Sequence, residues 1–334
     1  MKAHFVSRIF TATLIASVSM MAFANSEHTP AKGHGQFEFA LIGDTPYGVA
    51  PGQDYPPFDS LVNDINDHHK IKWIMHAGDI KSGGSLCSDA LFYDRLYRYN
   101  QFDKPVVLTP GDNEWTDCHR VKAGQYQPLE RLAKLREVFF AEPGHTIGGE
   151  TMRVNSQANT IGFEEFPENV MWSNQHVMFA TIHIVGSNNA LRAFDANSSA
   201  TRTQVDDDEV TRRTTAALIW MDKVFAKAEE QESPGVFIMI HANPGLERHS
   251  VDRSGFEAFL TALEHHITAF KKPVVLAHGD SHYFRVDKPA LVNSNFLPNF
   301  TRVETFGASR VHWLRVNVAP KSDNVFSIHQ EIIE

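Results

Sequence analysis

Residues 105–115 read PVVLTPGDNEW, in which a short apolar run leads into a turn with three polar side chains. Residues 106–108 form the apolar run, and residues 109–111 end it. Short apolar runs that end in turn residues are typical of strands buried on both faces of a sheet. Chemistry in such sheets gathers at the carboxyl ends of the strands. The polar side chains of residues 112–114 are therefore candidates for a functional site.

The same pattern, an apolar strand that ends in Asp or His and usually beside Gly, occurs at four further places. These are FALIGDTPYG (39–48), WIMHAGDIKSG (73–83), VFIMIHANPG (236–245) and VVLAHGDSH (274–282). One such ending is weak support for a site, whereas five in one chain predict a site shared at one edge of a sheet. The side chains at these strand ends are Asp44, Asp79, Asp112, His241, Asp280 and His282.

Carboxylate and imidazole side chains together suit ions such as Mn, Fe or Zn rather than an ion bound by thiolates. Four Asp residues are too many for one structural zinc site, but two ions that share a bridging carboxylate would use them all. Two such ions can clamp a phosphate and activate a water molecule for in-line attack. The alternative for each Asp taken alone is a turn or helix cap, and for each His an ordinary polar residue.

In this order the strand ends resemble the five-block pattern of calcineurin-like metallophosphoesterases. The matching blocks are GDTP at 43–46, GD at 78–79, GDNE at 111–114, His241 after its apolar strand and GDSH at 279–282, and the resemblance covers roughly residues 37–318. It implies a four-layer α-β-β-α sandwich with mixed sheets and hydrolysis of a phosphate ester by water activated between two divalent metal ions. It also implies that one ion is held by Asp44, Asp79 and His282, with Asp79 as the bridge, and the other by Asp112, His241 and Asp280.

The chain departs from the family pattern at several of these positions. Pro46 stands where the first block has a His, and Asp280 replaces the first His of the fifth block. In the third block Asp112 replaces an Asn ligand, and Asn113 replaces a His. Two neutral ligands have thus become carboxylates, which makes the site harder and more anionic. We expect Mn or Fe ions there, with Mg or Zn as the alternatives.

Catalytic roles are expected for Asn113, His241 and His282. Asn113 cannot act as an acid, although its amide can hydrogen-bond a phosphoryl oxygen. A general acid near neutral pH would have to be another His, and the candidates are His76, His119, His183 and His278. The expected substrate-binding residues are Asn113, Asn188 and Asn189, and further side chains that could face a substrate are Tyr47, Lys81, Trp115, Arg120 and Arg192.

The N-terminus has the features of a secretory signal peptide. Lys2 and Arg8 flank the start of an uncharged apolar run at 9–22, and residues 22–24, Ala-Phe-Ala, have the form of a cleavage site. We expect residues 1–24 to be removed and the protein to be exported, either to the periplasm or as a secreted protein. Residues 25–36 are then a flexible lead and residues 37–334 a single domain. The alternative is an uncleaved anchor.

Without Lys2 and Arg8 the chain keeps 29 basic against 40 acidic residues, a net charge of −11. Such a surface suits nucleic-acid backbones poorly, and no run after the signal peptide is long and apolar enough to span a membrane. The expected partner is a small phosphorylated substrate, and the sequence indicates no oligomeric state. The two cysteines, Cys87 and Cys118, are expected to form a disulfide in an oxidising compartment, with two free thiols as the alternative.

Hydrophobic periodicity predicts alternating strands and helices, followed by strands alone. Strands are expected at 37–42, 73–77, 105–108, 176–185, 236–240, 274–277, 311–318 and 325–333. Helices are expected at 56–69, 88–102, 128–140 and 254–270, and another from the acidic run at 206–209 to about residue 231. Residues 142–174 give no clear element.

Three functions are compatible with these patterns. The leading one is an exported, metal-dependent phosphoesterase. The second is a metal-binding but non-catalytic domain on the same fold, suggested by the histidines missing from the first and third blocks. The third, an envelope binding module without metal, requires five strand-end sites to arise by coincidence.

Overall fold

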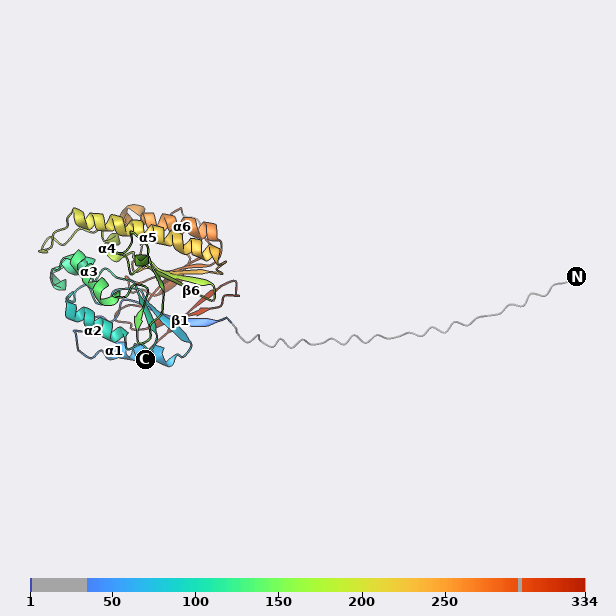
Figure 1. Ribbon diagram of the computed structural model, residues 1–334, viewed down its shortest axis with the longest axis horizontal. Coiled ribbons are helices and arrows are strands. Elements are labelled where there is room, and N and C mark those ends of the chain that lie inside the picture. Colours follow the sequence, from blue (N-terminus) through green and yellow to red (C-terminus); the bar gives the residue numbers. More distant parts are fainter. Residues whose placement is uncertain (2–34, 294–295, 334) are drawn as a thin grey trace. The chain divides into compact units, whose positions relative to one another are not determined.

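Two β-sheets pack face to face at the centre of the computed structural model (Figure 1). The structure describes residues 1, 35–293 and 296–333. The predicted signal peptide after Met1 and the predicted lead up to residue 34 lie outside the described residues. Within the described part of the chain, no helix has both the length and the apolar character that crossing a membrane requires.

The first sheet has a parallel centre and antiparallel edges. The parallel strands β1, β2 and β3 lie side by side, and β12, β13 and β4 pair antiparallel at the two edges. In spatial order its described strands are β13 (Phe326–Glu331), β12 (Trp313–Val318), β1 (Phe37–Ile42), β2 (Ile71–His76), β3 (Pro105–Leu108) and β4 (Ile147–Gly148).

The second sheet is also mixed, with β11, β9, β8 and β7 parallel and with β10, β6 and β5 antiparallel at its edges. In spatial order its described strands are β10 (Arg285–Asp287), β11 (Phe300–Glu304), β9 (Val274–His278), β8 (Val236–Met239), β7 (Val177–Thr181), β6 (Val170–Asn174) and β5 (Asn155–Ser156).

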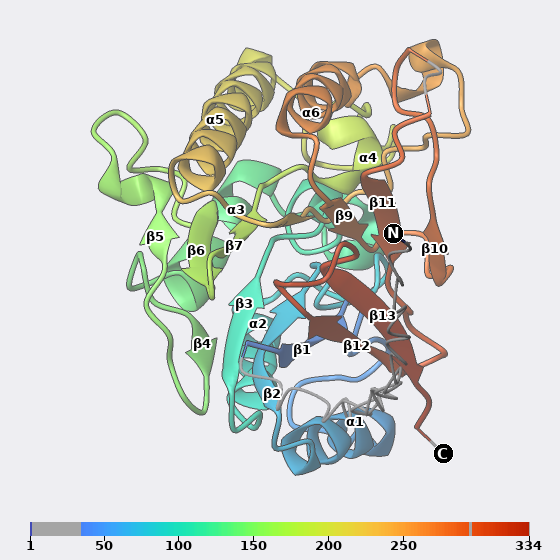
Figure 2. The same ribbon diagram turned by 90° about the vertical axis from the view of Figure 1, so that its right-hand side faces the viewer.

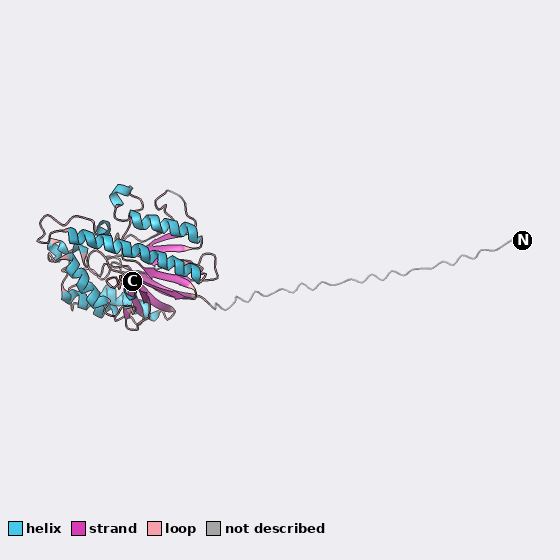
Figure 3. Ribbon diagram, turned by 45° about the horizontal axis from the view of Figure 1, so that its top comes forward, coloured by secondary structure: helices cyan, strands magenta, loops and turns pink. Residues whose placement is uncertain are grey.

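Helices cover the outer face of each sheet. The first sheet packs against α1 (Pro56–Asp67), α2 (Asp89–Tyr99) and α3 (Pro128–Phe139), and the second against α5 (Gln204–Glu230) and α6 (Glu257–Phe270). Figure 2 shows α5 and α6 beyond one sheet and α1 beyond the other, and Figure 3 shows the strands enclosed between the helices. This arrangement is the predicted four-layer α-β-β-α sandwich. Short elements in the loops are α4 (Gly186–Asn189) and the 3₁₀ turns η1 (Thr116–His119), η2 (Val121–Ala123), η3 (Gln157–Asn159) and η4 (Ser250–Arg253).

Strand β1 shows why the apolar runs in the sequence have little polar alternation. Phe37, Phe39 and Leu41 point between the two sheets, whereas Ala40 and Ile42 face the helices on the other side. Both faces of the strand are therefore buried, as expected for a sheet covered on both sides.

The structure differs from the predicted elements mainly in the second sheet. The strand expected at 176–185 ends at Thr181 and forms a hairpin with β6, which lies in the region without a predicted element. Gln175 and His176 form the turn, with φ of 49° and 66°. The sequence also does not predict the β10–β11 hairpin. These strands are short, and their pairing partners, rather than their own periodicity, define them.

Cys87 and Cys118 form a disulfide, which confirms the predicted pairing. Both residues are fully buried, and each Sγ lies 3.5 Å from the backbone carbonyl oxygen of Asn113. The disulfide thus joins the loop after β2 to the loop after β3, directly beneath Asn113.

Reduction of this disulfide should lower the free energy of unfolding by about 3–4 kcal/mol, because the bond closes a loop of intermediate length. Urea unfolding with and without a phosphine reductant measures the change. The double variant Cys87→Ala/Cys118→Ala is the control, and its unfolding midpoint should not respond to the reductant. Equal midpoints for the oxidised and reduced wild-type protein would contradict the prediction.

Candidate metal centre

The six predicted ligands follow strands whose carboxyl ends meet at one edge of the sandwich. They are Asp44, Asp79 and Asp112 after β1, β2 and β3 of the first sheet, and His241, Asp280 and His282 after β8 and β9 of the second. Four of them, all except Asp112 and His241, have φ between 53° and 79°. Non-glycine residues rarely adopt this conformation, and here it turns the chain sharply as each strand ends.

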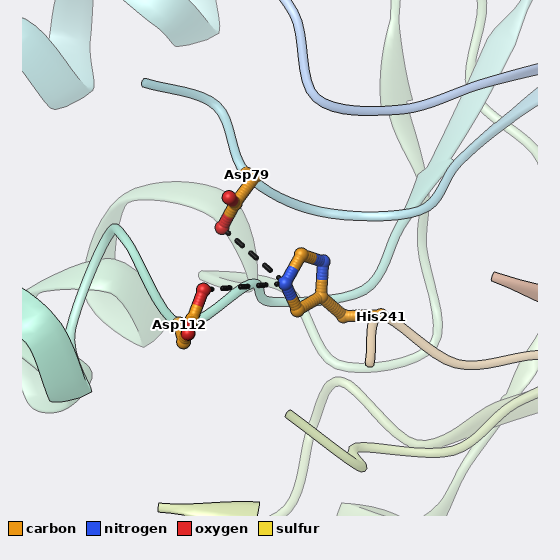
Figure 4. A group of neighbouring side chains, drawn as sticks. All are labelled: Asp79, Asp112 and His241. Carbon is orange, nitrogen blue, oxygen red and sulfur yellow. Dashed lines mark ion pairs between the residues drawn. The ribbon is translucent and has the colours of Figure 1, made fainter. Parts of the chain in front are cut away.

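Asp79, Asp112 and His241 form the tightest group, shown in Figure 4. All three are buried, and one potential ligand atom from each lies within 4.8 Å of the others. Nε2 of His241 lies 3.4 Å from Oδ1 of Asp79 and 3.4 Å from Oδ1 of Asp112. The imidazole of the second sheet therefore points between two carboxylates of the first.

The other imidazole nitrogen defines what Nε2 of His241 can do. Nδ1 lies 2.7 Å from the backbone carbonyl oxygen of Ala77, so it must carry the proton and donate it. In the neutral ring Nε2 then holds a lone pair, and it has no hydrogen-bond partner within the described residues. An N–H donor to a carbonyl behind the ring is the usual arrangement of a metal-binding histidine. The donor set of two carboxylates and one imidazole thus fits a divalent ion.

The electrostatics of His241 also indicate that this group attracts a cation. Burial alone would lower the pKa of the imidazole, but the carboxylates of Asp79 and Asp112 outweigh burial and raise the pKa well above its usual value. Burial raises the pKa of Asp79, while the positive charge of protonated His241 helps to lower that of Asp112 to about 2. A metal ion in this position would replace the proton on Nε2.

Asp79 also contacts two residues of neighbouring loops. The Tyr47 hydroxyl donates to Oδ2 of Asp79 at 2.6 Å, and the amide nitrogen of Asn113 donates to the same oxygen. The backbone N–H of Asn113 donates to Oδ1 at 3.0 Å. Burial and the charge of Asp79 raise the pKa of Tyr47 well above its usual value, so its hydroxyl is protonated. Asn113 therefore lies beside the group formed by Asp79, Asp112 and His241, as its place in the sequence predicts.

Asp112 has a neighbour that the sequence did not identify. Oγ of Ser187 lies 3.0 Å from Oδ2 of Asp112 and 2.8 Å from Oδ1 of Asp117. Burial, with Asp112 nearby, raises the pKa of Asp117 to about 7, and the Arg120 guanidinium lies 2.5 Å from its second oxygen. Ser187 follows the strand predicted at 176–185, but nothing in the sequence pairs it with Asp112.

Asp44, Asp280 and His282 form a second group beside the first. Nε2 of His282 lies 3.4 Å from Oδ1 of Asp44, and the hydrogen bond between them raises the pKa of His282. The backbone N–H of Asp280 donates to Asp44 at 3.0 Å, while Oδ2 of Asp280 accepts the N–H of Asn243 at 3.1 Å. Burial and the charge of Asp112 raise the pKa of Asp280 to about 6. All six predicted ligands thus lie in two adjoining groups.

Glu114 and Lys81 hold in place the loops that carry Asp79 and Asn113. Oε1 of Glu114 accepts the backbone N–H of Asp79 at 3.1 Å and that of Gly111 at 2.5 Å, which fixes the two loops together. Nζ of Lys81 donates to the carbonyl of Asn113 at 2.6 Å, and burial lowers the pKa of this fully buried amine to about 8. Lys81 and Trp115 are buried, so neither faces a substrate.

The amides of Asn188 and Asn189 bond to residues outside the group formed by Asp79, Asp112 and His241. Asn188 pairs through its amide with Ser254 and the N–H of Gly255. Asn189 is fully buried, where its amide nitrogen donates to Thr214 and its oxygen accepts from Arg213. Both amides join the 186–190 turn to neighbouring loops and helices, and these bonds give no support to the predicted substrate role.

The four histidines considered as general acids are all buried in structural positions. Nδ1 of His76 accepts the N–H of Gly78, and Nε2 lies 2.9 Å from the carbonyl of Thr45. His278 bonds to the carbonyl of Gly279, His183 bonds to Glu168, and His119 stacks on Phe194. Burial lowers the pKa of His76 and His183 to about 4 and that of His278 to about 3. These three are neutral near pH 7 and cannot serve as the acid there.

Comparison with known families gives a match over most of the chain. The model of the calcineurin-like phosphoesterase family matches residues 37–284, which include all six predicted ligands. A search among curated proteins finds no match.

Acid should destabilise the protein partly through His183. Its pKa is about 4 when folded and 6.5 when unfolded, so the unfolded chain takes up a proton first as the pH falls below 6.5. The free energy of unfolding should therefore fall between pH 6.5 and 4, by up to about 3 kcal/mol from this group. Urea unfolding of metal-free protein across this range measures the slope.

His183→Asn should reduce this pH dependence, because an Asn side chain can keep a hydrogen bond to Glu168 but does not titrate. His329→Asn, at an exposed position in β13, is the matched control and should retain the wild-type slope. An unchanged slope in His183→Asn would show that the buried imidazole does not take part in acid unfolding.

Proposed function

The chain belongs to the calcineurin-like phosphoesterase family, and from this premise we propose that it is an exported, metal-dependent phosphoesterase. The observation that carries the proposal is the position of Nε2 of His241, which points between the carboxylates of Asp79 and Asp112 and lies 3.4 Å from an oxygen of each. A buried arrangement of this kind needs a cation.

The residues divide into two sets of ligands. Asp79, Asp112 and His241 would hold one ion, with Asp280 beside them, and Asp44, Asp79 and His282 would hold the other. Bound divalent ions would supply an activated water and neutralise the oxygens of the phosphoryl group. The carboxylate-rich set favours Mn or Fe, with Mg or Zn as alternatives.

Arg120 is the side chain best placed to orient a phosphorylated substrate, whereas the amide nitrogen of Asn113 already donates to Asp79 and Tyr47. A side chain at Gly83 would meet Oδ1 of Asn113 at 2.7 Å and Nη1 of Arg120 at 2.9 Å, so both groups border the same small space beside the cluster. Arg120 is partly exposed and can hydrogen-bond phosphoryl oxygens in addition to Asp117. His241 and His282 serve as ligands in this proposal rather than as proton donors.

Export is supported by the N-terminal pattern of residues 1–24 and by the buried disulfide, which an oxidising compartment would maintain. In this proposal residues 37–334 act as one domain on a small phosphorylated substrate. The second candidate is a metal-binding domain without activity, which Pro46 and Asn113 favour because they replace two imidazoles of the family pattern.

Asp112→Ala should lower metal affinity and the hydrolysis of p-nitrophenyl phosphate and bis-p-nitrophenyl phosphate at least about 100-fold, because a direct ligand is removed. Metal content is measured by elemental analysis and activity with added Mn, Fe, Mg or Zn. Asp222→Ala, on the exposed face of α5, is the control and should behave as wild type.

The outcomes separate the candidate functions. A purified protein that holds no metal and hydrolyses neither ester with any of the four ions refutes the phosphoesterase. If the wild-type protein binds metal but hydrolyses neither ester, and Asp112→Ala no longer binds the metal, the non-catalytic domain is favoured.

A further inference from the structure

The two carboxylate oxygens of Asp79 have different surroundings. Oδ1 accepts the backbone N–H of Asn113 and lies 3.4 Å from the unpartnered Nε2 of His241. Oδ2 accepts both the Tyr47 hydroxyl and the side-chain amide of Asn113. Each carboxylate oxygen offers about two lone-pair directions. Oδ1 therefore keeps one direction free for an ion beside His241, whereas both directions of Oδ2 are occupied.

Tyr47 is fixed in this position by its surroundings. Its ring packs edge-on against the imidazole of His282, with 5.2 Å between the ring centroids. Its hydroxyl also lies 3.0 Å from the amide nitrogen of Asn113. The phenol therefore lies between Asp79 and His282, which belong to the same proposed set of ligands.

Asp44, the third member of that set, is also engaged in hydrogen bonds. Its two oxygens lie 3.0 and 3.2 Å from the backbone N–H of Asp280, and its Oδ2 lies 3.5 Å from the hydroxyl of Thr305. The sequence adds a further difference, since Pro46 provides no ligand in the loop after β1. We therefore expect the ligand set of Asp44, Asp79 and His282 to bind an ion more weakly than the set of Asp79, Asp112 and His241.

We propose that the Tyr47 hydroxyl caps Asp79 and makes the two metal sites unequal. The first ion binds at Asp79, Asp112 and His241, where Oδ1 of Asp79 keeps one direction free and the ion replaces the proton on Nε2 of His241. A second ion at Asp44, Asp79 and His282 gains Oδ2 of Asp79 only after the Tyr47 hydrogen bond is released. Tyr47 thus sets the metal concentration at which the centre changes from one ion to two. This inference rests on the ligand sets of the proposed function.

Titration of the metal-free protein with Mn²⁺, followed by calorimetry and by equilibrium dialysis with elemental analysis, tests the proposal. Wild-type protein should bind one ion tightly and a second at least roughly tenfold more weakly. Tyr47→Phe keeps the ring against His282 but removes the hydroxyl, so the second affinity should rise roughly tenfold while the first is unchanged.

Tyr283→Phe is the matched control, because Tyr283 follows His282 at the rim but is 67% exposed and makes no side-chain hydrogen bond within the described residues. It should bind Mn²⁺ as wild type does. Far-ultraviolet circular dichroism and the urea midpoint check that each variant is folded.

Three results would overturn the role of Tyr47. These are equal affinities for both ions in the wild type, unchanged binding in Tyr47→Phe, and a weaker second ion in Tyr47→Phe, which would make Tyr47 itself a ligand. The binding readout is independent of turnover. The two proposals can therefore fail separately. If the wild type binds two ions unequally, Tyr47→Phe makes the affinities more equal and no ester is hydrolysed, the role of Tyr47 stands and the phosphoesterase is refuted. If no variant binds Mn²⁺, both proposals are refuted.

Discussion

Burying several carboxylates side by side costs free energy, because each loses hydration and repels its neighbours. The edge of this sandwich gathers Asp44, Asp79, Asp112, Glu114, Asp117 and Asp280. Backbone N–H groups and the cations Lys81 and Arg120 offset part of the repulsion. The raised pKa of His241 shows that negative charge still remains after these contributions. A divalent ion neutralises more of this negative charge than one proton does. The excess negative charge is therefore the reason that the cluster suits a metal ion.

The fold creates this crowding through strand order and through glycine. Parallel β1, β2 and β3 deliver three carboxylates from adjacent strands, and the second sheet faces them with an imidazole. A Cβ at Gly111 would overlap the carboxylate of Asp79, and one at Gly279 would overlap that of Asp44. Gly111 and Gly279 therefore precede Asp112 and Asp280 because a carboxylate that follows another strand occupies the space that a side chain would need.

The sequence predicted these features because they arise locally. Apolar runs that end in Gly and Asp mark strand ends, and their order matches a family, so both the sandwich and the clustering of the six candidate ligands could be predicted. Short strands such as β4 and β10 did not follow, since pairing with distant residues defines them. The contacts of Tyr47 with Asp79 and of Ser187 with Asp112 span 32 and 75 residues, and no periodicity encodes them. The partners of Asn188 and Asn189 are also distant in the sequence, since their amides bond to residues of the loop at 254–255 and of α5.

The same electrostatics limit the chemistry. Asn113 occupies the position of a family histidine and has no proton to give, and three nearby histidines are neutral because burial lowers their pKa values. In the proposed reaction, neither Asn113 nor these three histidines would protonate the leaving group. Extra carboxylates at Asp112 and Asp280 reduce the attraction for a dianionic phosphate, and Arg120 at the rim partly restores it. A phosphodiester carries less negative charge than a phosphomonoester. A carboxylate-rich centre with a partly exposed arginine at its rim would therefore repel a diester less than a monoester.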